Sequence, residues 1–382
     1  MILNRCILHI DMDTFFVSVE RLLNSSFNEK PVVVGGISER GVVASCSYEA
    51  RKYGIHSGMP MKMARSLCND AMFIRGDMEQ YSKFSRMVTE IIAEKAPLYE
   101  KTSIDEHYLD LTGMDHFFGC MKWTKELRQV ILKETGLPVS MGLSCNKTVS
   151  KIATGEAKPN GELEVKRNEA KSFLAPLSVR KIPGIGKKTY YLLATMGVNK
   201  IQTLSVIPLP VITNVLGKNG EDIWKKANGI DNTLVKPYSE HKSISTEQTF
   251  EQDTIDFKRL TEIIAVMSEK LAFELRNQQK ITSCVTIKIR YSNFDTHTLQ
   301  KCIPYTSFDH TIIEVAKELF KQLYNRRLLV RLVGVKFSHL VHGFQQLSLF
   351  DDRAKMAALY PVLDKLKNQY GSKIIRRAIA FH

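Results

Sequence analysis

Acidic side chains stand at two points where predicted apolar β-strands end. The segment HIDMD at 9–13 closes the first strand with Asp11, and the segment SIDE at 103–106 places Asp105 and Glu106 in a turn between two short strands. Acids at such positions are costly unless something compensates for their charge, and a divalent cation compensates best. The two segments therefore indicate Mg²⁺. Two ions about 3.5–4 Å apart, held by carboxylates on adjacent strands, would stabilise the attacking and leaving oxygens of a phosphoryl transfer.

Each of these acids has an alternative role, which is to cap a helix or a turn. Asp13 comes just before a helical pattern, and we expect its carboxylate to cap that helix. For Asp11, Asp105 and Glu106 taken as a set, we prefer the metal-binding interpretation.

The elements that must position these acids alternate between strand and helix patterns up to about residue 165. The segments CILHID, PVVVGG and GVVASCS are typical of strands, and TFFVSVERLLN, residues 79–95 and MKWTKELRQVILKET have helical spacing. From there to about 233 the pattern is helical and basic, with breaks at Pro and Gly. The fold class predicted for this part is mixed α/β.

The rest of the chain predicts an independent small α+β domain. Residues 234–244 mix Pro, Ser and charge without periodicity, which suits a tether. Helices are expected near 256–277 and 309–325, and strands in SCVTIKIRYS and LVGVKFSHL. The tail from 351 is expected to be helical on either side of Pro361.

Composition excludes several classes of protein. The chain has 382 residues, which favours two to four domains, and no apolar run reaches the roughly 18 residues that a membrane span needs. The start is interpreted as a first strand and not as a signal peptide, because acids follow at once. The 7 cysteines form no CxxC pair, so their spacing predicts neither a disulfide framework nor a zinc site, and a reducing, cytoplasmic compartment is expected.

The charge favours a polyanionic partner such as nucleic acid. Lys and Arg total 54 against 40 acids, a formal charge of +14. The excess is concentrated in residues 147–200, which carry 11 Lys or Arg against 4 Glu, a net of +7. Residues 147–200 are therefore the first candidates for contact with a phosphate backbone.

Four motifs carry a resemblance to a known family. HIDMDTFFVSVE, SYEARKYGI, SIDEHYLD and AKPNG occur in the order and spacing of the Y-family DNA polymerases, and the resemblance covers residues 2 to about 350. It implies a right-hand architecture of α/β and α+β domains. The implied parts are a palm (1–18 and 76–165), fingers (19–75), a helical thumb (166–233), a linker (234–243), a little finger (244–341) and a tail (342–382).

The resemblance also implies the catalytic and metal-binding residues. The ligands of two Mg²⁺ ions would be Asp11, Asp105 and Glu106, with the backbone carbonyl of Met12 as a further ligand.

Further resemblance concerns the nucleotide. Tyr48, Arg51 and Lys158 match the family's triphosphate-binding positions, where cationic groups suit dispersed phosphate charge. Phe16 matches the steric gate, whose ring lies under the sugar where a 2′-hydroxyl would clash, so that deoxynucleotides are preferred. The neighbouring Phe15 is expected to pack in the core. Ser45 is a candidate for lining the nascent base pair, with an ordinary turn role as the alternative.

Position 107 departs from the family, which more often has a small or apolar residue there. His107 could ligate a metal or shuttle a proton, but we prefer a packed or solvent-facing ring.

Two further segments are candidates for binding the DNA backbone. The PGIG hairpin supplies Gly184 and Gly186, followed by Lys187 and Lys188, and its amides and helix start suit a phosphate. In the strand SCVTIKIRYS the basic residues alternate with apolar ones, which equally suits a half-exposed sheet; these residues are Lys288 and Arg290.

A short segment resembles the peptide by which bacterial polymerases dock on the sliding clamp. It consists of Gln346, Leu347, Ser348, Leu349 and Phe350. Two Leu and a Phe exposed past a domain end suit insertion into a partner's pocket.

The sequence as a whole predicts an error-prone, translesion DNA polymerase without a proofreading exonuclease. Its partners would be primer-template DNA, deoxynucleoside triphosphates and a sliding clamp, and it would act as a monomer. One rival is a catalytically silent DNA- and clamp-binding protein, which retention of the carboxylates argues against. Another is a nucleotidyl cyclase, which shares a related palm but would not need the PGIG thumb, the little finger or the clamp peptide.

Overall fold

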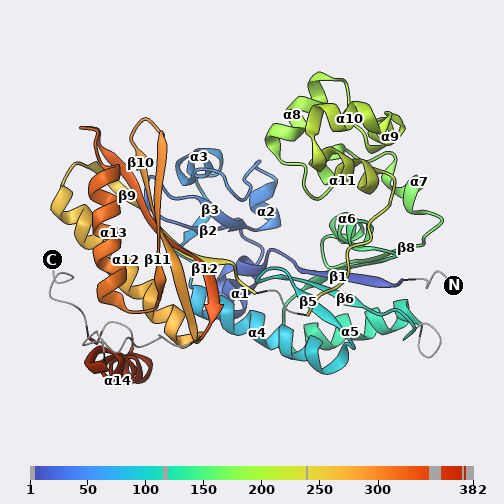
Figure 1. The fold of residues 1–382 in the computed structure, drawn as a ribbon. Helices are drawn as coiled ribbons and strands as arrows, with labels where there is room; N and C mark the ends of the chain where they lie inside the picture. Colours follow the sequence, from blue (N-terminus) through green and yellow to red (C-terminus); the bar gives the residue numbers. More distant parts are fainter. Residues whose placement is uncertain (1–4, 115–118, 238–239, 344–353, 372–373, 376–382) are drawn as a thin grey trace. The chain divides into compact units, whose positions relative to one another are not determined.

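The computed structural model describes residues 5–114, 119–237, 240–343, 354–371 and 374–375 (Figure 1). The chain divides into two compact units, Met1–Ser239 and Glu240–His382. The division falls inside the segment expected to be a tether. Among the described residues, no helix combines the length and the apolar character that crossing a bilayer requires.

The first unit is built around a five-stranded sheet. The strands lie in the order β5-β6-β1-β7-β8, and the central strand β1 pairs antiparallel with both β6 and β7. Their bounds are β1 Ile7–Met12, β5 Tyr99–Lys101, β6 Glu106–Asp110, β7 Val139–Ser144 and β8 Glu162–Val165.

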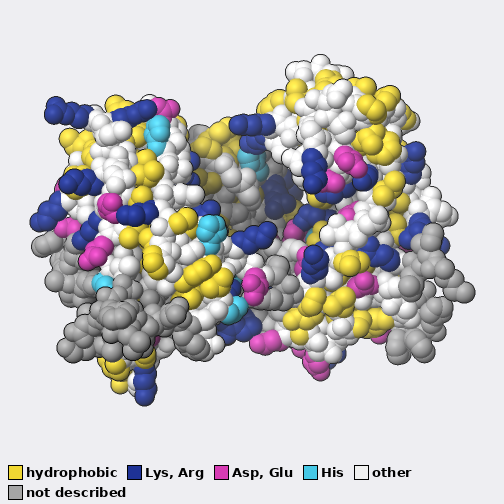
Figure 2. All heavy atoms as spheres, in the orientation of Figure 1, with side chains coloured by type: hydrophobic (Ala, Val, Ile, Leu, Met, Phe, Trp, Pro, Cys, Tyr) yellow, Lys and Arg dark blue, Asp and Glu magenta, His cyan; other side chains and the backbone are white. Residues whose placement is uncertain are grey.

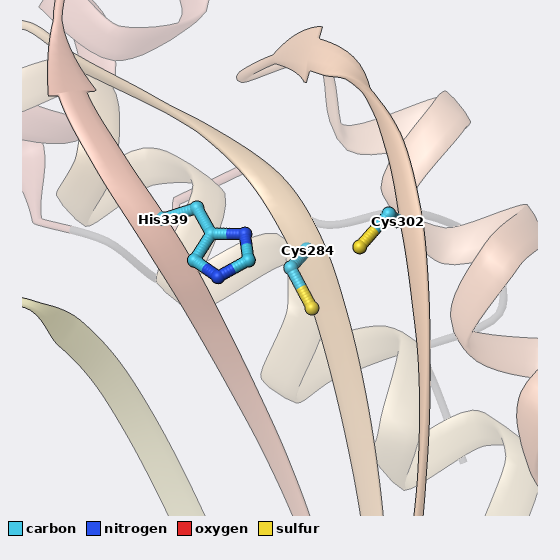
Figure 3. Close-up of side chains that lie close together, drawn as sticks. All are labelled: Cys284, Cys302 and His339. Carbon is cyan, nitrogen blue, oxygen red and sulfur yellow. The ribbon is translucent and has the colours of Figure 1, made fainter.

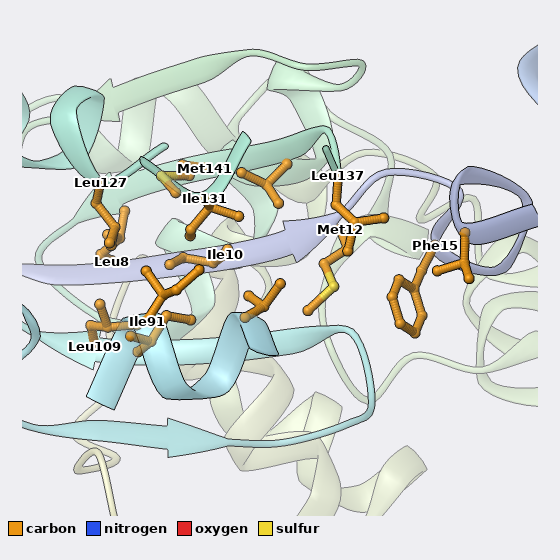
Figure 4. Packing of buried hydrophobic residues seen from close by; sticks show 14 of the residues in the cluster. Leu8, Ile10, Met12, Phe15, Ile91, Leu109, Leu127, Ile131, Leu137 and Met141 are labelled. Carbon is orange, nitrogen blue, oxygen red and sulfur yellow. The ribbon is translucent and has the colours of Figure 1, made fainter. Parts of the chain in front are cut away.

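The residues of β1 alternate between the two faces of this sheet, as the period of a strand requires. Leu8, Ile10 and Met12 lie in a core that includes side chains of α4 (Met78–Lys95) and α5 (Cys120–Thr135) (Figure 4). His9 turns to the other face, where its Nδ1 lies 2.9 Å from Thr154 Oγ1 of α6 (Lys147–Ala157). Asp11 shares that second face.

A smaller sheet and its helices follow β1. The order is β3-β2-β4, with β2 and β3 antiparallel and β2 and β4 parallel. The elements are α1 Phe15–Leu23, η1 Ser25–Phe27, β2 Val32–Gly35, β3 Val43–Cys46, α2 Tyr48–Arg51, α3 Met61–Leu67 and β4 Met72–Ile74.

The segment expected to be helical and basic is helical. Its elements pack around one apolar core. They are α7 Ala170–Leu174, η3 Val179–Lys181, α8 Lys187–Thr195, α9 Ile201–Val206, α10 Leu209–Leu216 and α11 Lys218–Ala227.

The second unit is an antiparallel sheet in the order β11-β10-β12-β9. Its apolar core joins one face of the sheet to two helices, which confirms the predicted α+β pattern. The elements are β9 Ser243–Thr254, α12 Phe257–Asn277, β10 Lys280–Tyr291, β11 Thr296–Thr306, α13 Asp309–Leu323 and β12 Val330–His342.

The tail adds a helix to the second unit. Helix α14 (Ala354–Tyr370) runs through Pro361, so the expected helix on either side of that proline is confirmed. Its Asp364 carboxylate accepts two hydrogen bonds from Arg276 of α12. These findings establish the predicted fold class, while the boundaries of palm, fingers and thumb stay predictions.

Candidate active site

Three acidic residues from two distant parts of the chain lie at the end of β1. Asp11 is the direct partner of Glu106 in the antiparallel pairing of β1 with β6. Asp105 immediately precedes β6, and its backbone carbonyl accepts a hydrogen bond of 3.1 Å from the Met12 amide. Directly opposed residues of antiparallel strands have Cβ atoms about 4.5–5.5 Å apart. The two segments singled out in the sequence therefore form one acidic cluster.

Two lysines neutralise part of this cluster. Lys158 Nζ lies 2.5 Å from Asp11 Oδ1, and Lys151 Nζ lies 2.5 and 2.6 Å from the two oxygens of Glu106. Three carboxylates against two ammonium groups leave excess negative charge. Lys151 was not predicted from the sequence; its place on α6, one turn before Thr154, brings it to the sheet.

Burial and neighbouring charges shift the pKa values of Asp11 and Glu106 in opposite directions. Burial raises the pKa of Asp11 to about 6, although Lys158 acts against this. Burial alone would raise the pKa of Glu106, but hydrogen bonds and charge from His9 and Lys151 outweigh it and lower that pKa to about 2. Because burial also lowers the pKa of His9, we assign most of this effect to Lys151.

The cluster fits a hard divalent cation, which prefers oxygen ligands. The carboxylates of Asp11, Asp105 and Glu106 supply such oxygens at one end of the sheet. The Met12 side chain is buried in the core, so its backbone carbonyl is the group that it could offer.

The prediction that Asp13 caps helix α1 is wrong. The N-cap residue is Thr14, in a left-handed conformation with φ 41°, and no side chain caps the helix. The buried Asp13 carboxylate instead accepts hydrogen bonds from Ser140 Oγ, the Asn160 amide and the Tyr48 hydroxyl. These donors satisfy it better than one helix amide would, and they link β1 to the AKPNG turn and to α2.

Tyr48 and Arg51 lie on the short helix α2 beside this buried acid. The Tyr48 hydroxyl donates to Asp13 Oδ1 over 3.3 Å, and the Arg51 guanidinium lies 4.9 Å from the centre of the Tyr48 ring. Burial raises the pKa of Tyr48, which keeps its hydroxyl a donor at neutral pH. Lys158 Nζ is 3.9 Å from Asp13 Oδ1, so the structure brings the predicted triphosphate residues to one region.

The two phenylalanines differ as expected in burial. Phe15 lies in the core with 3% of its surface exposed, which confirms its packing role. Phe16 is partly buried and stacks on Tyr81 of α4, with ring centres 4.2 Å apart and planes 13° apart. Tyr81 is held in turn by a hydrogen bond to Glu20, and the sequence analysis did not identify Tyr81.

Ser45 lies within β3 opposite Val34, not in a turn.

His107 packs inside the protein, as preferred from the sequence. It follows Glu106 along β6, so its side chain is on the opposite face of the sheet from the acidic cluster. The ring is fully buried and its Nε2 lies 3.0 Å from Thr89 Oγ1 of α4. Burial lowers its pKa to about 3, so the ring is neutral.

The PGIG hairpin presents its basic residues to solvent. Gly184 has φ 104°, a conformation that favours glycine, and Lys226 of α11 donates to the Pro183 carbonyl. Gly186 precedes α8, and Lys187 and Lys188 in its first turn are exposed. Figure 2 shows Lys and Arg side chains over both units, with acids among them.

The basic residues of β10 lie on the sheet face away from α12 and α13. Lys288 pairs with Glu247 at 2.8 Å, and Arg290 Nε donates to Thr296 Oγ1. Their alternation with buried Ile287 and Ile289 confirms a half-exposed sheet, and DNA contact stays a prediction. The proposed clamp peptide, 346–350, lies outside the described residues.

The site is a mixed five-stranded sheet with acids at the facing ends of the antiparallel strands β1 and β6, an arrangement suited to phosphoryl transfer. Family models match three parts of the chain: the impB/mucB/samB family over residues 10–155, the IMS family HHH motif over 167–198, and the impB/mucB/samB family C-terminal domain over 241–349.

Proteins of similar sequence and structure agree with these family matches. A DNA polymerase IV of Dehalococcoides mccartyi is 40% identical over 96% of this chain and 95% of its own length, and one of Listeria innocua is 36% identical over 88% and 96%. Among solved structures, a Y-family DNA polymerase chimera, Dbh-Dpo4(243-245)-Dbh, has a TM-score of 0.79 at 26% identity and covers 88% of this chain and all of its own.

A second solved structure, an insertion ternary complex of Dbh DNA polymerase, has a TM-score of 0.65 at 26% identity, with 88% of this chain and all of its own covered. The chain belongs to the Y family of DNA polymerases, and it is a DNA-directed DNA polymerase.

Proposed function

We propose that this chain extends a primer 3′ end across damaged as well as intact template by two-metal nucleotidyl transfer, without proofreading. The observation that carries the proposal is the cross-strand meeting of Asp11 and Glu106 beside Asp105. Two Mg²⁺ ions held there would activate the 3′-oxygen and neutralise charge on the leaving pyrophosphate. The three carboxylates would hold these ions, with the Met12 carbonyl as a further ligand.

The residues around the cluster bind the triphosphate in this proposal. Lys158 and Arg51 supply positive charge, and Tyr48 supplies a protonated hydroxyl. Asp13 fixes Tyr48 through a buried hydrogen-bond network, so it acts as a positioning residue. Ser45 of β3 is proposed to line the nascent base pair.

Phe16 selects the sugar in this proposal. Its ring is held by stacking on Tyr81, and Tyr81 is itself held by Glu20, so the ring cannot easily move aside. A rigid ring under the sugar excludes a 2′-hydroxyl by steric overlap.

Each unit contributes contacts to primer-template DNA in this proposal. In the first, the amides after Gly184 and Gly186 and the exposed Lys187 and Lys188 grip the phosphate backbone without reading sequence. In the second, the sheet face that carries Lys288 and Arg290 does so. We further propose that residues 346–350 dock on a sliding clamp and that the enzyme is a cytoplasmic monomer.

Primer extension with Mg²⁺ tests the proposal. Asp105→Asn should reduce synthesis by roughly 10²–10³-fold or more, the size expected when one charge-stabilising group is lost. Asp110→Asn is the matched control, because Asp110 lies at the far end of β6, opposite Ile7, and should leave synthesis unchanged. Phe16→Ala should allow ribonucleotide incorporation. Full activity in Asp105→Asn would remove the basis of the proposal.

A further inference from the structure

Three potential metal ligands lie together on the sheet of the second unit, away from the acidic cluster. Cys284 of β10 is the direct partner of Cys302 of β11, and His339 lies on β12, on the other side of β10 (Figure 3). The two sulfur atoms and a ring nitrogen of His339 are within 4.8 Å of one another. The spacing of these residues along the chain gave no sign of a zinc site, whereas the pairing of the strands brings them together.

The backbone at His339 explains how the imidazole reaches the cysteines. Val335 and Phe337 point into the core under α12 and α13, so strict alternation would send residue 339 to the same side. His339 instead has φ 54°, a left-handed conformation that is uncommon for a residue other than glycine. The alternation shifts by one residue there, because Leu340 packs against the core and His339 is exposed.

We propose that Cys284, Cys302 and His339 bind a thiophilic divalent cation, Zn²⁺, with water as the fourth ligand. Two thiolates and an imidazole are ligands that Zn²⁺ prefers, and three protein ligands with one solvent position is an established coordination. Zn–S distances of about 2.3 Å and Zn–N distances of about 2.0–2.1 Å place tetrahedral ligand atoms about 3.4–3.8 Å apart.

The ligand atoms of the three residues can reach these tetrahedral separations from their positions in the structure. Cys302 and His339 are exposed, so rotation of their side chains can bring their ligand atoms about 1 Å closer to the buried Cys284. The two sulfur atoms lie side by side across the paired strands, where a divalent cation would neutralise two neighbouring thiolates.

The bound ion would join β11, β10 and β12 on the face that carries Lys288 and Arg290. Two thiolates and one Zn²⁺ sum to no net charge, so the ion would hold the strands without adding to the positive charge of this face. The site is formed wholly within the second unit and is independent of polymerisation chemistry.

Cobalt substitution in the full-length, reduced and chelator-treated protein tests the site. Co²⁺ bound by thiolates gives a sulfur-to-metal charge-transfer absorption, which carboxylate sites do not give. We expect this band to saturate at one equivalent and Zn²⁺ to abolish it. Cys302→Ser and His339→Asn should each weaken binding at least about tenfold; Asn tolerates the left-handed conformation, so the second variant keeps the fold.

The matched control is Cys145→Ser, a thiol of the first unit, which should leave the band unchanged. Asp105→Asn should keep the cobalt band of the wild type while it loses primer extension, which separates this test from that of the polymerase site. No charge-transfer band in the wild type, or a band in Cys302→Ser that saturates at the same Co²⁺ concentration as in the wild type, would overturn the proposal.

Discussion

Replacing Arg276 by Met should detach helix α14 from the second unit. Arg276 donates two hydrogen bonds to Asp364 of α14, at 2.6 and 2.9 Å, and a third, of 2.6 Å, to Asp309 at the start of α13. The Arg276 guanidinium also lies 4.6 Å from the ring centre of Tyr360 on α14. One side chain therefore joins three helices.

The burial of these groups sets the size of the effect. The exposed fractions are 12% for Arg276, 5% for Asp309 and 13% for Asp364, so the ion pairs are well shielded from water. Removing one partner of such a pair costs about 3–5 kcal/mol, because it leaves an uncompensated buried charge. At 1.36 kcal/mol for each factor of ten, this corresponds to roughly 10²- to 10³-fold or more in the opening equilibrium of α14.

Amide hydrogen exchange, resolved by peptide, measures this opening. We expect α14 to lose protection in Arg276→Met by that factor, while β10 at the centre of the sheet loses much less. Lys270→Met on the exposed side of α12 is the control and should change nothing. A change below tenfold in α14 would show that other contacts, such as the Lys367–Glu269 ion pair and the apolar packing, hold the helix without Arg276.

Three other perturbations address the catalytic unit and the tail. His107→Ala should cost about 2–4 kcal/mol in the free energy of unfolding measured with denaturant, while primer extension stays nearly intact; a large loss of synthesis would place the ring in catalysis. Tyr81→Leu should loosen Phe16 and raise ribonucleotide incorporation towards that of Phe16→Ala, in an assay with mixed nucleotides. Deleting 346–350 should abolish stimulation of primer extension by a sliding clamp and spare distributive synthesis, and unchanged stimulation would contradict the docking proposal.

The acidic cluster could be predicted because each acid ends or precedes a recognisable apolar strand. Asp11 lies one residue before the end of β1 and Asp105 precedes β6, and pairing of those strands was the simplest way to hold cations. The prediction that Asp13 caps a helix was wrong because it considered only neighbouring residues, whereas the hydrogen-bond partners of Asp13 are distant in the chain. The left-handed Thr14 and the Ser140 hydroxyl on β7 are not visible from the segment around residue 13.

Sequence patterns did not identify residues whose roles depend on contacts with distant parts of the chain. Lys151 and Tyr81 lie on helices where a charge or an aromatic ring has an ordinary local explanation, and their partners are distant in the chain. The cluster of Cys284, Cys302 and His339 was not predicted from the sequence for another reason. It depends on the pairing of β10 with two strands and on one unusual φ angle at His339, neither of which the order of residues reveals.

The pairing of β1 with β6 also has a consequence for the energetics of catalysis. Because Asp11 and Glu106 are joined through the hydrogen bonds of two paired strands, their separation is fixed by the rigid backbone and not by mobile loops. In the proposed mechanism the site is thus preorganised, and little reorganisation free energy would have to be supplied when charge develops in the transition state.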